Sequence, residues 1–166
     1  MCHNSQMKFT RRTQLLFPIG VAIASFGLTS NATASPFTLP VAQTLDDDLK
    51  HAVSHNQPLV VMVGFEGCPF CKVVRQNYLP SVQQEQKLTI VEIDMRKNIP
   101  VRDFSGQLTT HEQLAKDWHI KVAPTLLFYG KDGREVARRL VGLSPDFYSA
   151  YLQDRIDRAI ASFKQL

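Results

Sequence analysis

Apolar residues recur along the chain in two different periods, and these predict alternating helices and strands over residues 44–166. Between Thr44 and His55 they return every three or four residues, which predicts a helix with one buried face. Leu59–Val63 is a continuous apolar run, typical of a strand that is buried on both sides. Residues 88–94 alternate between apolar and polar and predict a second strand. Because the stretch between these strands reads as a helix, we expect the two strands to pair in parallel.

The second half of the domain continues the pattern. A loop is predicted over residues 95–109, and capping-box spacing between Thr110 and Gln113 then predicts a short helix ending at His119. The runs Thr125–Tyr129 and Arg134–Val141 predict two strands that form a hairpin around the turn Gly130–Gly133.

A last helix is expected to start at Ser144-Pro145-Asp146. Pro80 is expected to end or kink the helix between the first two strands. The buried face of the last helix is predicted to hold Tyr148, Leu152, Ile156, Ala159 and Phe163. The fold class that follows is α/β, with a small mixed four-stranded sheet and helices on both of its faces.

The first 34 residues have the pattern of a secretory signal peptide. Lys8, Arg11 and Arg12 precede a short apolar run over residues 15–28, and Ala32-Thr33-Ala34 supplies the small residues that a signal peptidase reads. The apolar run is short for a membrane span, which needs about 20 residues. We therefore expect cleavage after Ala34 and a periplasmic location, with a retained anchor as the alternative.

Cleavage would leave a loose leader over residues 35–43 and one domain over residues 44–166. Residues 1–34 hold three of the 19 Lys and Arg residues and none of the 15 Asp and Glu residues. The remaining chain thus carries 16 basic and 15 acidic side chains, a formal charge of +1 in place of +4. Its charge gives no reason to expect a nucleic-acid partner or stable membrane association.

Cys2 would be removed with the signal peptide, which leaves Cys68 and Cys71 as the two cysteines of the mature chain. A C-x-x-C pair at the start of a helix suits thiol–disulfide exchange, because the first cysteine is favoured as a thiolate and the second can resolve the mixed disulfide. We predict that Cys68 attacks and that Cys71 resolves. No second pair completes a zinc site, and so close a pair constrains the fold too little to be structural.

A second motif, Ala123-Pro124-Thr125, places a proline at the entrance of a predicted strand. With Cys68-Pro69-Phe70-Cys71 between a strand and a helix, the order of elements resembles the thioredoxin superfamily over nearly all of residues 44–166. The resemblance implies that Pro124 follows a cis peptide bond and lies against Cys68. It also implies that Pro69, Phe70, Ala123 and Thr125 contact the substrate.

Within the superfamily, the chain is most similar to periplasmic thioredoxin-like proteins found with sulfur-oxidation genes. It departs from thioredoxins proper at Met62, where they bury an acid that helps to deprotonate the resolving thiol. We hypothesise that Glu66 accepts the proton of the resolving thiol in this chain. The alternative is that Glu66 is a solvated carboxylate in a turn. The loop predicted over residues 95–109 carries three basic side chains, Arg96, Lys97 and Arg102. This part of the loop either selects protein partners or is a solvated insertion.

The function expected from these features is that of an exported reductase of periplasmic protein disulfides. It would act on protein thiols and disulfides and receive electrons from a donor in the membrane, with no cofactor and no metal of its own. Two alternatives stay open: an oxidase or isomerase of folding secreted proteins, and a copper-binding assembly chaperone. The sequence does not distinguish the redox direction.

Overall fold

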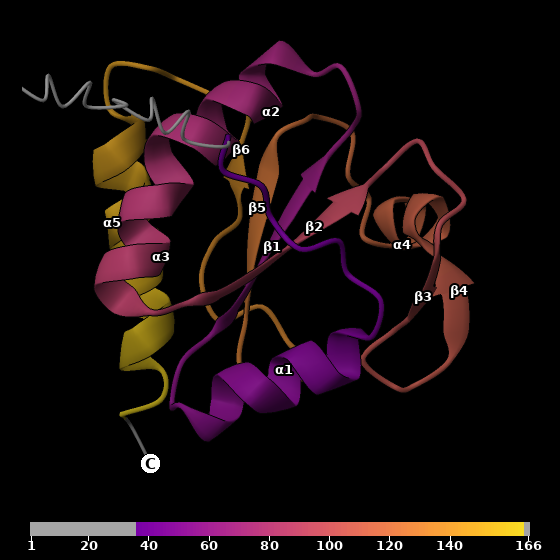
Figure 1. Ribbon diagram of the computed structural model, residues 1–166. Coiled ribbons are helices and arrows are strands. Elements are labelled where there is room, and N and C mark those ends of the chain that lie inside the picture. The colour runs from indigo at the N-terminus through magenta and orange to yellow at the C-terminus, as the bar shows by residue number, and fades with distance from the viewer. Residues whose placement is uncertain (1–35, 165–166) are drawn as a thin grey trace, which may run out of the picture. The chain divides into compact units, whose positions relative to one another are not determined.

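The computed structural model describes residues 36–164, so the expected signal peptide lies outside the described residues. Four strands form one sheet in the order β2-β1-β5-β6 (Figure 1). The central strand β1 (Leu59–Gly64) runs parallel to β2 (Thr89–Asp94) and antiparallel to β5 (Thr125–Tyr129), and β5 pairs antiparallel with the short β6 (Leu140–Val141). The predicted mixed four-stranded sheet is confirmed.

Helices cover both faces of this sheet. Side chains along a strand point alternately to its two faces, and β1 divides in this way between two apolar cores. Val60 and Met62 pack with α2 (Pro69–Val73), α3 (Leu79–Gln86) and α5 (Tyr148–Ala161). Val61 and Val63 pack on the other side with α1 (Leu45–Ser54) and α4 (His111–Asp117). The helix α2, which follows the first cysteine, therefore lies in the layer that α3 and α5 share (Figure 1).

The two ends of the domain fit the predicted helices closely. The helix α1 covers the expected stretch, and all five residues assigned to the inner face of the last helix are buried. That helix begins later than expected, at Tyr148, because residues 145–147 form a turn. None of the helices within residues 36–164 is long and apolar enough to cross a membrane.

The helix that follows the cysteines was expected to end or kink at Pro80, and the helical path does not end there. A π-helical segment, η1 (Val74–Tyr78), follows α2, and Pro80 then lies in the first turn of α3. A proline is tolerated there because the first amide groups of a helix have no partner within it. The helical path thus continues to Gln86 and ends where Lys87 adopts a left-handed conformation with φ 54°.

Two other expectations were only partly right. The segment 95–109 is not all loop, since β3 (Pro100–Arg102) and β4 (Leu108–Thr110) pair as a small hairpin. The strand expected over residues 134–141 is reduced to β6 and one bridge from Tyr129 to Glu135. Arg139 turns back to form an ion pair with Glu135, although four residues of extended strand would span about 13 Å. The segment is therefore bent.

Candidate active site

Cys68 lies at the point where β1 gives way to α2. A three-residue turn, residues 65–67, connects the two elements, and the Cys68 amide closes it with a hydrogen bond to the Phe65 carbonyl oxygen at 3.2 Å. Gly67 has φ +79°, a left-handed conformation that favours glycine over any residue with a β-carbon. Pro69 then occupies the first helical position, for which its fixed φ is suited. Local sequence thus places Cys68 at the helix start.

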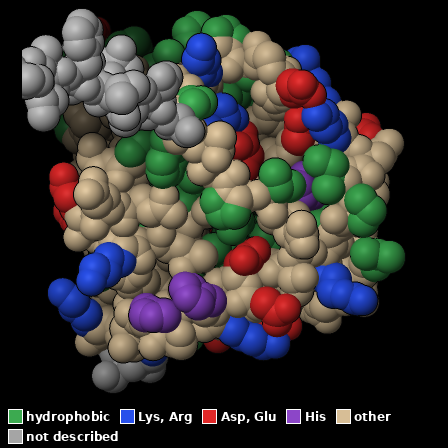
Figure 2. Space-filling model, in the orientation of Figure 1, with side chains coloured by type: hydrophobic (Ala, Val, Ile, Leu, Met, Phe, Trp, Pro, Cys, Tyr) green, Lys and Arg blue, Asp and Glu red, His purple; other side chains and the backbone are tan. Residues whose placement is uncertain are grey.

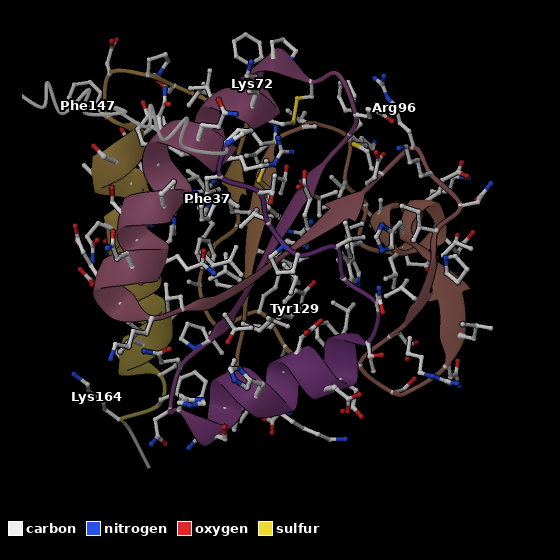
Figure 3. The ribbon with its side chains drawn as sticks, in the orientation of Figure 1. Phe37, Lys72, Arg96, Tyr129, Phe147 and Lys164 are labelled. Carbon is white, nitrogen blue, oxygen red and sulfur yellow. A yellow bond between two sulfur atoms is a disulfide. The ribbon has the colours of Figure 1, made fainter. Side chains whose placement is uncertain are left out.

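The two cysteines form a disulfide with an S–S distance of 2.12 Å. Figure 3 shows it near the top of the view, between the labelled residues Lys72 and Arg96. Cys68 is 6% exposed, Cys71 is fully buried, and Cys68 Sγ accepts a hydrogen bond from the Cys71 amide at 3.1 Å. An incoming thiol therefore reaches Cys68 first, which fits the prediction that Cys68 attacks and Cys71 resolves.

The Ala123–Pro124 peptide bond is cis, as the resemblance implied. The loop around it is held from two sides: the Gly142 amide donates to the Pro124 carbonyl oxygen at 2.7 Å, and the Thr125 hydroxyl donates to the Val122 carbonyl oxygen at 2.7 Å. Ala123 packs against the core that contains both cysteines. Thr125 is buried, so its side chain stabilises the loop and leaves only backbone groups for a substrate.

Several apolar side chains are exposed near these motifs. Phe70 is 58% exposed, and Pro69 beside it is exposed as well. Val122, next to the cis-proline loop, and Val141, next to Gly142, are also exposed. A β-carbon at Gly142 would lie 3.9 Å from Val122 Cγ1, so these two loops are neighbours. Sequence reasoning named Pro69 and Phe70 and missed the two valines.

Glu66 lies in the turn before Cys68 but points toward solvent. Its side chain is 77% exposed and forms an ion pair with Lys97, with 2.5 Å between carboxylate oxygen and Nζ. The hydrogen bond to this carboxylate raises the pKa of Lys97 above its ordinary value. Glu66 as proton acceptor stays a hypothesis, and its nearest ionic partner is this lysine.

The loop after β2 rests on the same turn. The Arg96 guanidinium lies 3.5 Å from the centre of the Phe65 ring, a cation–π contact. Figure 2 shows acidic and basic side chains mixed at the upper right of this face, where the loop and the turn meet. The beginning of the loop therefore forms part of the wall beside the disulfide, whereas Arg102 donates to the Gly106 carbonyl oxygen within the hairpin.

A cavity of about 450 Å³ opens next to Cys68. Its charged lining consists of Glu66, Lys72, Arg75, Glu92, Asp94 and Lys97. Within it, Arg75 of η1 and Glu92 of β2 form a half-buried ion pair. Sequence reasoning missed this pair, although a glutamate in the middle of an otherwise apolar strand was a usable signal. No group of three or more His, Cys, Asp or Glu side chains within residues 36–164 is arranged to hold a metal ion.

Comparison with known proteins agrees with this geometry. Residues 45–155 match the family model of the thioredoxin-like domain. The chain belongs to the thioredoxin-like family. Family membership and the paired cysteines at a helix start make it a thiol–disulfide oxidoreductase that acts on protein thiols and disulfides. No curated protein matches the chain significantly.

Solved structures of low sequence identity share the fold of this thioredoxin-like protein. A thioredoxin h from poplar has 19% identity and a TM-score of 0.52, over 70% of this chain and 96% of its own. Mitochondrial thioredoxin 3 from Saccharomyces cerevisiae has 20% identity and a TM-score of 0.50, over 72% and 93%. The thioredoxin of Fasciola hepatica has 20% identity and a TM-score of 0.50, over 73% and 99%.

Proposed function

We propose that this protein is an exported reductase of protein disulfides, which works in the periplasm and is recharged by an electron donor in the membrane. Reduced Cys68 attacks a substrate disulfide and forms a mixed disulfide, and Cys71 then releases the reduced substrate. Export is supported by the charged start, the short apolar run and the Ala32-Thr33-Ala34 site of the sequence.

The observation that carries the direction of transfer is that a Cys68 thiolate gains little stabilisation beyond that of the helix start at which it lies. A strong disulfide oxidant owes its high potential to a stabilised reduced form. Here Pro69 has no amide hydrogen to give, and the Phe70 side chain offers neither a charge nor a donor. Within residues 36–164, the hydrogen bond that Cys68 Sγ accepts comes from the Cys71 amide. A weakly stabilised thiolate favours a reducing couple.

The size of the domain is in line with this direction. The stretch between the end of β2 and Pro124 holds only the β3–β4 hairpin and α4. The large helical insertion expected of a periplasmic oxidase does not fit in it. Phe70 lies beside Cys68, and Val122 and Val141 lie beside the cis-proline loop. These exposed apolar side chains offer a surface on which an extended segment of a substrate protein can lie.

The decisive experiment is the reduction potential of the Cys68–Cys71 couple. Full-length protein carrying Cys2→Ser is equilibrated with graded thiol–disulfide buffers, and the reduced fraction is read by alkylation and mass. Known couples extend from about −270 mV for a reductant to about −120 mV for a strong oxidant. We expect a value below about −220 mV, whereas a value above about −180 mV would overturn the proposal in favour of an oxidase or isomerase.

Export is tested separately by fractionating cells that express the full chain. We expect a periplasmic protein whose mass corresponds to a start at Ser35. A chain that keeps residues 1–34 in the membrane fraction would establish the anchored alternative instead.

A further inference from the structure

The buried thiol of Cys71 presents a chemical problem that its immediate neighbours in sequence do not solve. The thiolate is the nucleophile in disulfide exchange, and burial among apolar groups makes a thiol hold its proton more tightly. Cys71 has no exposed surface, and it packs in the core that also contains Met62. A thioether is not a base at neutral pH. Some other group has to take the proton when Cys71 attacks.

Glu92 is the carboxylate that the fold brings to this sulfur. In β2 it follows the alternation of the strand and shares the face of Ile90, on the side of the sheet that α2 covers. Its register partner in β1 is Met62, and its side chain is only 16% exposed. A charged residue at this depth beneath the active-site helix needs a reason, because burying a charge is costly.

Gly64 shows how close the two groups lie. A β-carbon built on Gly64 would be 3.2 Å from Cys71 Sγ and 3.3 Å from Glu92 Oε1. The sulfur and the carboxylate oxygen thus face the same small space. The distance between Cys71 Sγ and Glu92 Oε1 can be no greater than the sum of these two distances. A gap of that size is closed directly or by one bridging water molecule. Glycine at this position keeps the space free.

Arg75 holds the Glu92 carboxylate in place. Its Nε donates to Oε2 at 3.0 Å and its second guanidinium nitrogen donates to Oε1, a two-pronged arrangement. Each carboxylate oxygen has two acceptor sites, so Oε1 retains one for a further hydrogen bond. The backbone of Glu92 is fixed as well, because Pro40 and Ala42 pair with it from the N-terminal side.

We propose that Glu92 is the proton acceptor of Cys71 in the resolving step, and that Arg75 is its positioning residue. The Cys71 S–H proton passes to Glu92 Oε1 as Cys71 Sγ bonds to Cys68 Sγ. The bond between Cys68 and the substrate sulfur breaks, and its electron pair leaves with that sulfur as a thiolate. The protein dithiol is oxidised and the substrate disulfide reduced by two electrons, and Glu92 later returns its proton to water through the cavity. This inference rests on disulfide exchange itself, in either direction, and is independent of the compartment.

The test separates the two chemical steps. Reduced full-length protein carrying Cys2→Ser, in excess, is mixed with dithio-bis-nitrobenzoate in a stopped-flow instrument. Attack by Cys68 releases one yellow thiolate at a rate proportional to protein concentration. Attack by Cys71 on the resulting mixed disulfide releases a second thiolate at a rate independent of concentration. Both rates are measured across pH.

We expect Glu92→Gln to slow the second release by about ten-fold or more at neutral pH and to leave the first unchanged. The difference should shrink as pH rises, because hydroxide then removes the Cys71 proton directly. The other charged groups facing the cavity, Glu66, Lys72, Asp94 and Lys97, remain in this variant and provide the same background in both proteins.

Two further variants guard against a mere loss of structure. Gly64→Ala places a methyl group between thiol and carboxylate while keeping both, and Gly64 does not have the positive φ that would forbid alanine. It should slow the same step. The double variant Glu92→Gln with Arg75→Gln leaves no unpaired guanidinium behind, and should resolve as slowly as the single variant.

The matched control is Glu135→Gln, which breaks the other two-pronged Arg–Glu pair, with Arg139, and lines no part of the cavity beside Cys68. Its two rates should equal those of the parent protein. The proposal is overturned if Glu92→Gln resolves at the parent rate, or if it is slowed equally at every pH. It is also overturned if Glu66→Gln, and not Glu92→Gln, changes the pH profile.

Discussion

The two faces of the sheet treat their buried polar groups differently. On the face covered by α1 and α4, His111 is fully buried and has a backbone partner for each ring nitrogen: Nδ1 accepts from the Asp94 amide at 3.1 Å, and Nε2 donates to the Ala42 carbonyl oxygen at 2.8 Å. On the face covered by α2, Glu92 pairs with Arg75 and still opens toward Cys71 and the cavity. A polar group with every site occupied holds the fold together, whereas one with a free acceptor site is available for chemistry.

The largest effect is expected on stability, from the variant His111→Leu. It tests whether the buried histidine serves the fold and not the chemistry. Leucine can make neither hydrogen bond, so the Asp94 amide and the Ala42 carbonyl oxygen lose their partner. We expect the free energy of unfolding, measured in urea, to fall by about 2–4 kcal/mol. The concentration-independent release of thiolate by the folded variant should stay at the parent rate.

A loss of stability below about 1 kcal/mol would mean that water replaces the histidine without cost, and the contrast between the faces would fail. A slower resolving step in a variant that is still folded would break the contrast in the other direction, since it would connect His111 to the chemistry of Cys71.

An intermediate effect is expected at the surface, from Phe70→Ala. Phe70 is largely exposed beside Cys68, so its loss should leave the melting temperature unchanged. We expect KM for reduction of a protein disulfide to rise by about ten-fold, an effect of the order seen when an aromatic side chain that anchors an interface is removed. Leu108→Ala is the matched control, because Leu108 is another exposed apolar side chain but belongs to the β3–β4 hairpin. An equal rise in both variants would contradict a docking surface at Phe70.

The smallest effect is expected on amide exchange in the turn of the β3–β4 hairpin. Burial acts to raise the pKa of Asp103, but hydrogen bonds from Ser105, Gln107 and Gly106 outweigh it and lower that pKa below its ordinary value. A carboxyl group with a lowered pKa contributes stability above its unfolded pKa, and this contribution disappears as pH falls through the folded value.

We therefore expect the amides of Ser105 and Gln107, which donate to the Asp103 carboxylate, to exchange faster with solvent below about pH 4, relative to their intrinsic rates. Asp103→Asn should remove this pH dependence while leaving disulfide exchange intact. Protection that is independent of pH in the parent protein would show that the turn holds without the carboxylate.

The sequence predicted those elements whose apolar period extends over several turns or a whole strand. The helices α1 and α5 and the strands β1 and β5 belong to this group. The two motifs around Cys68 and Pro124 were found in another way, from residue identity and spacing. The hairpin of β3 and β4 was missed because strands of three residues carry too little alternation to stand out. The bend before β6, across which Glu135 and Arg139 pair, was missed because no apolar period marks it.

The same reasoning explains what was missing from the candidate site. Cys68 and Cys71 are neighbours in the sequence, so their chemistry is visible there. The pairing of Arg75 with Glu92, and the approach of Glu92 to Cys71, depend on the register in which β1 lies against β2. No local pattern encodes that register. A glutamate in a buried strand was the one available hint.

The segment Pro40–Ala42 also has a consequence for where the chain can be cut. It pairs with β2 at Glu92 and so covers that edge of the sheet at this point, whereas the edge at β6 is only two residues long. Uncovered strand edges invite pairing with other chains and aggregation. Cleavage after Ala34 would retain this protective segment together with residues 35–39. Trimming beyond Ala42 would instead leave the outer edge of β2 unpaired and open to pairing with other chains.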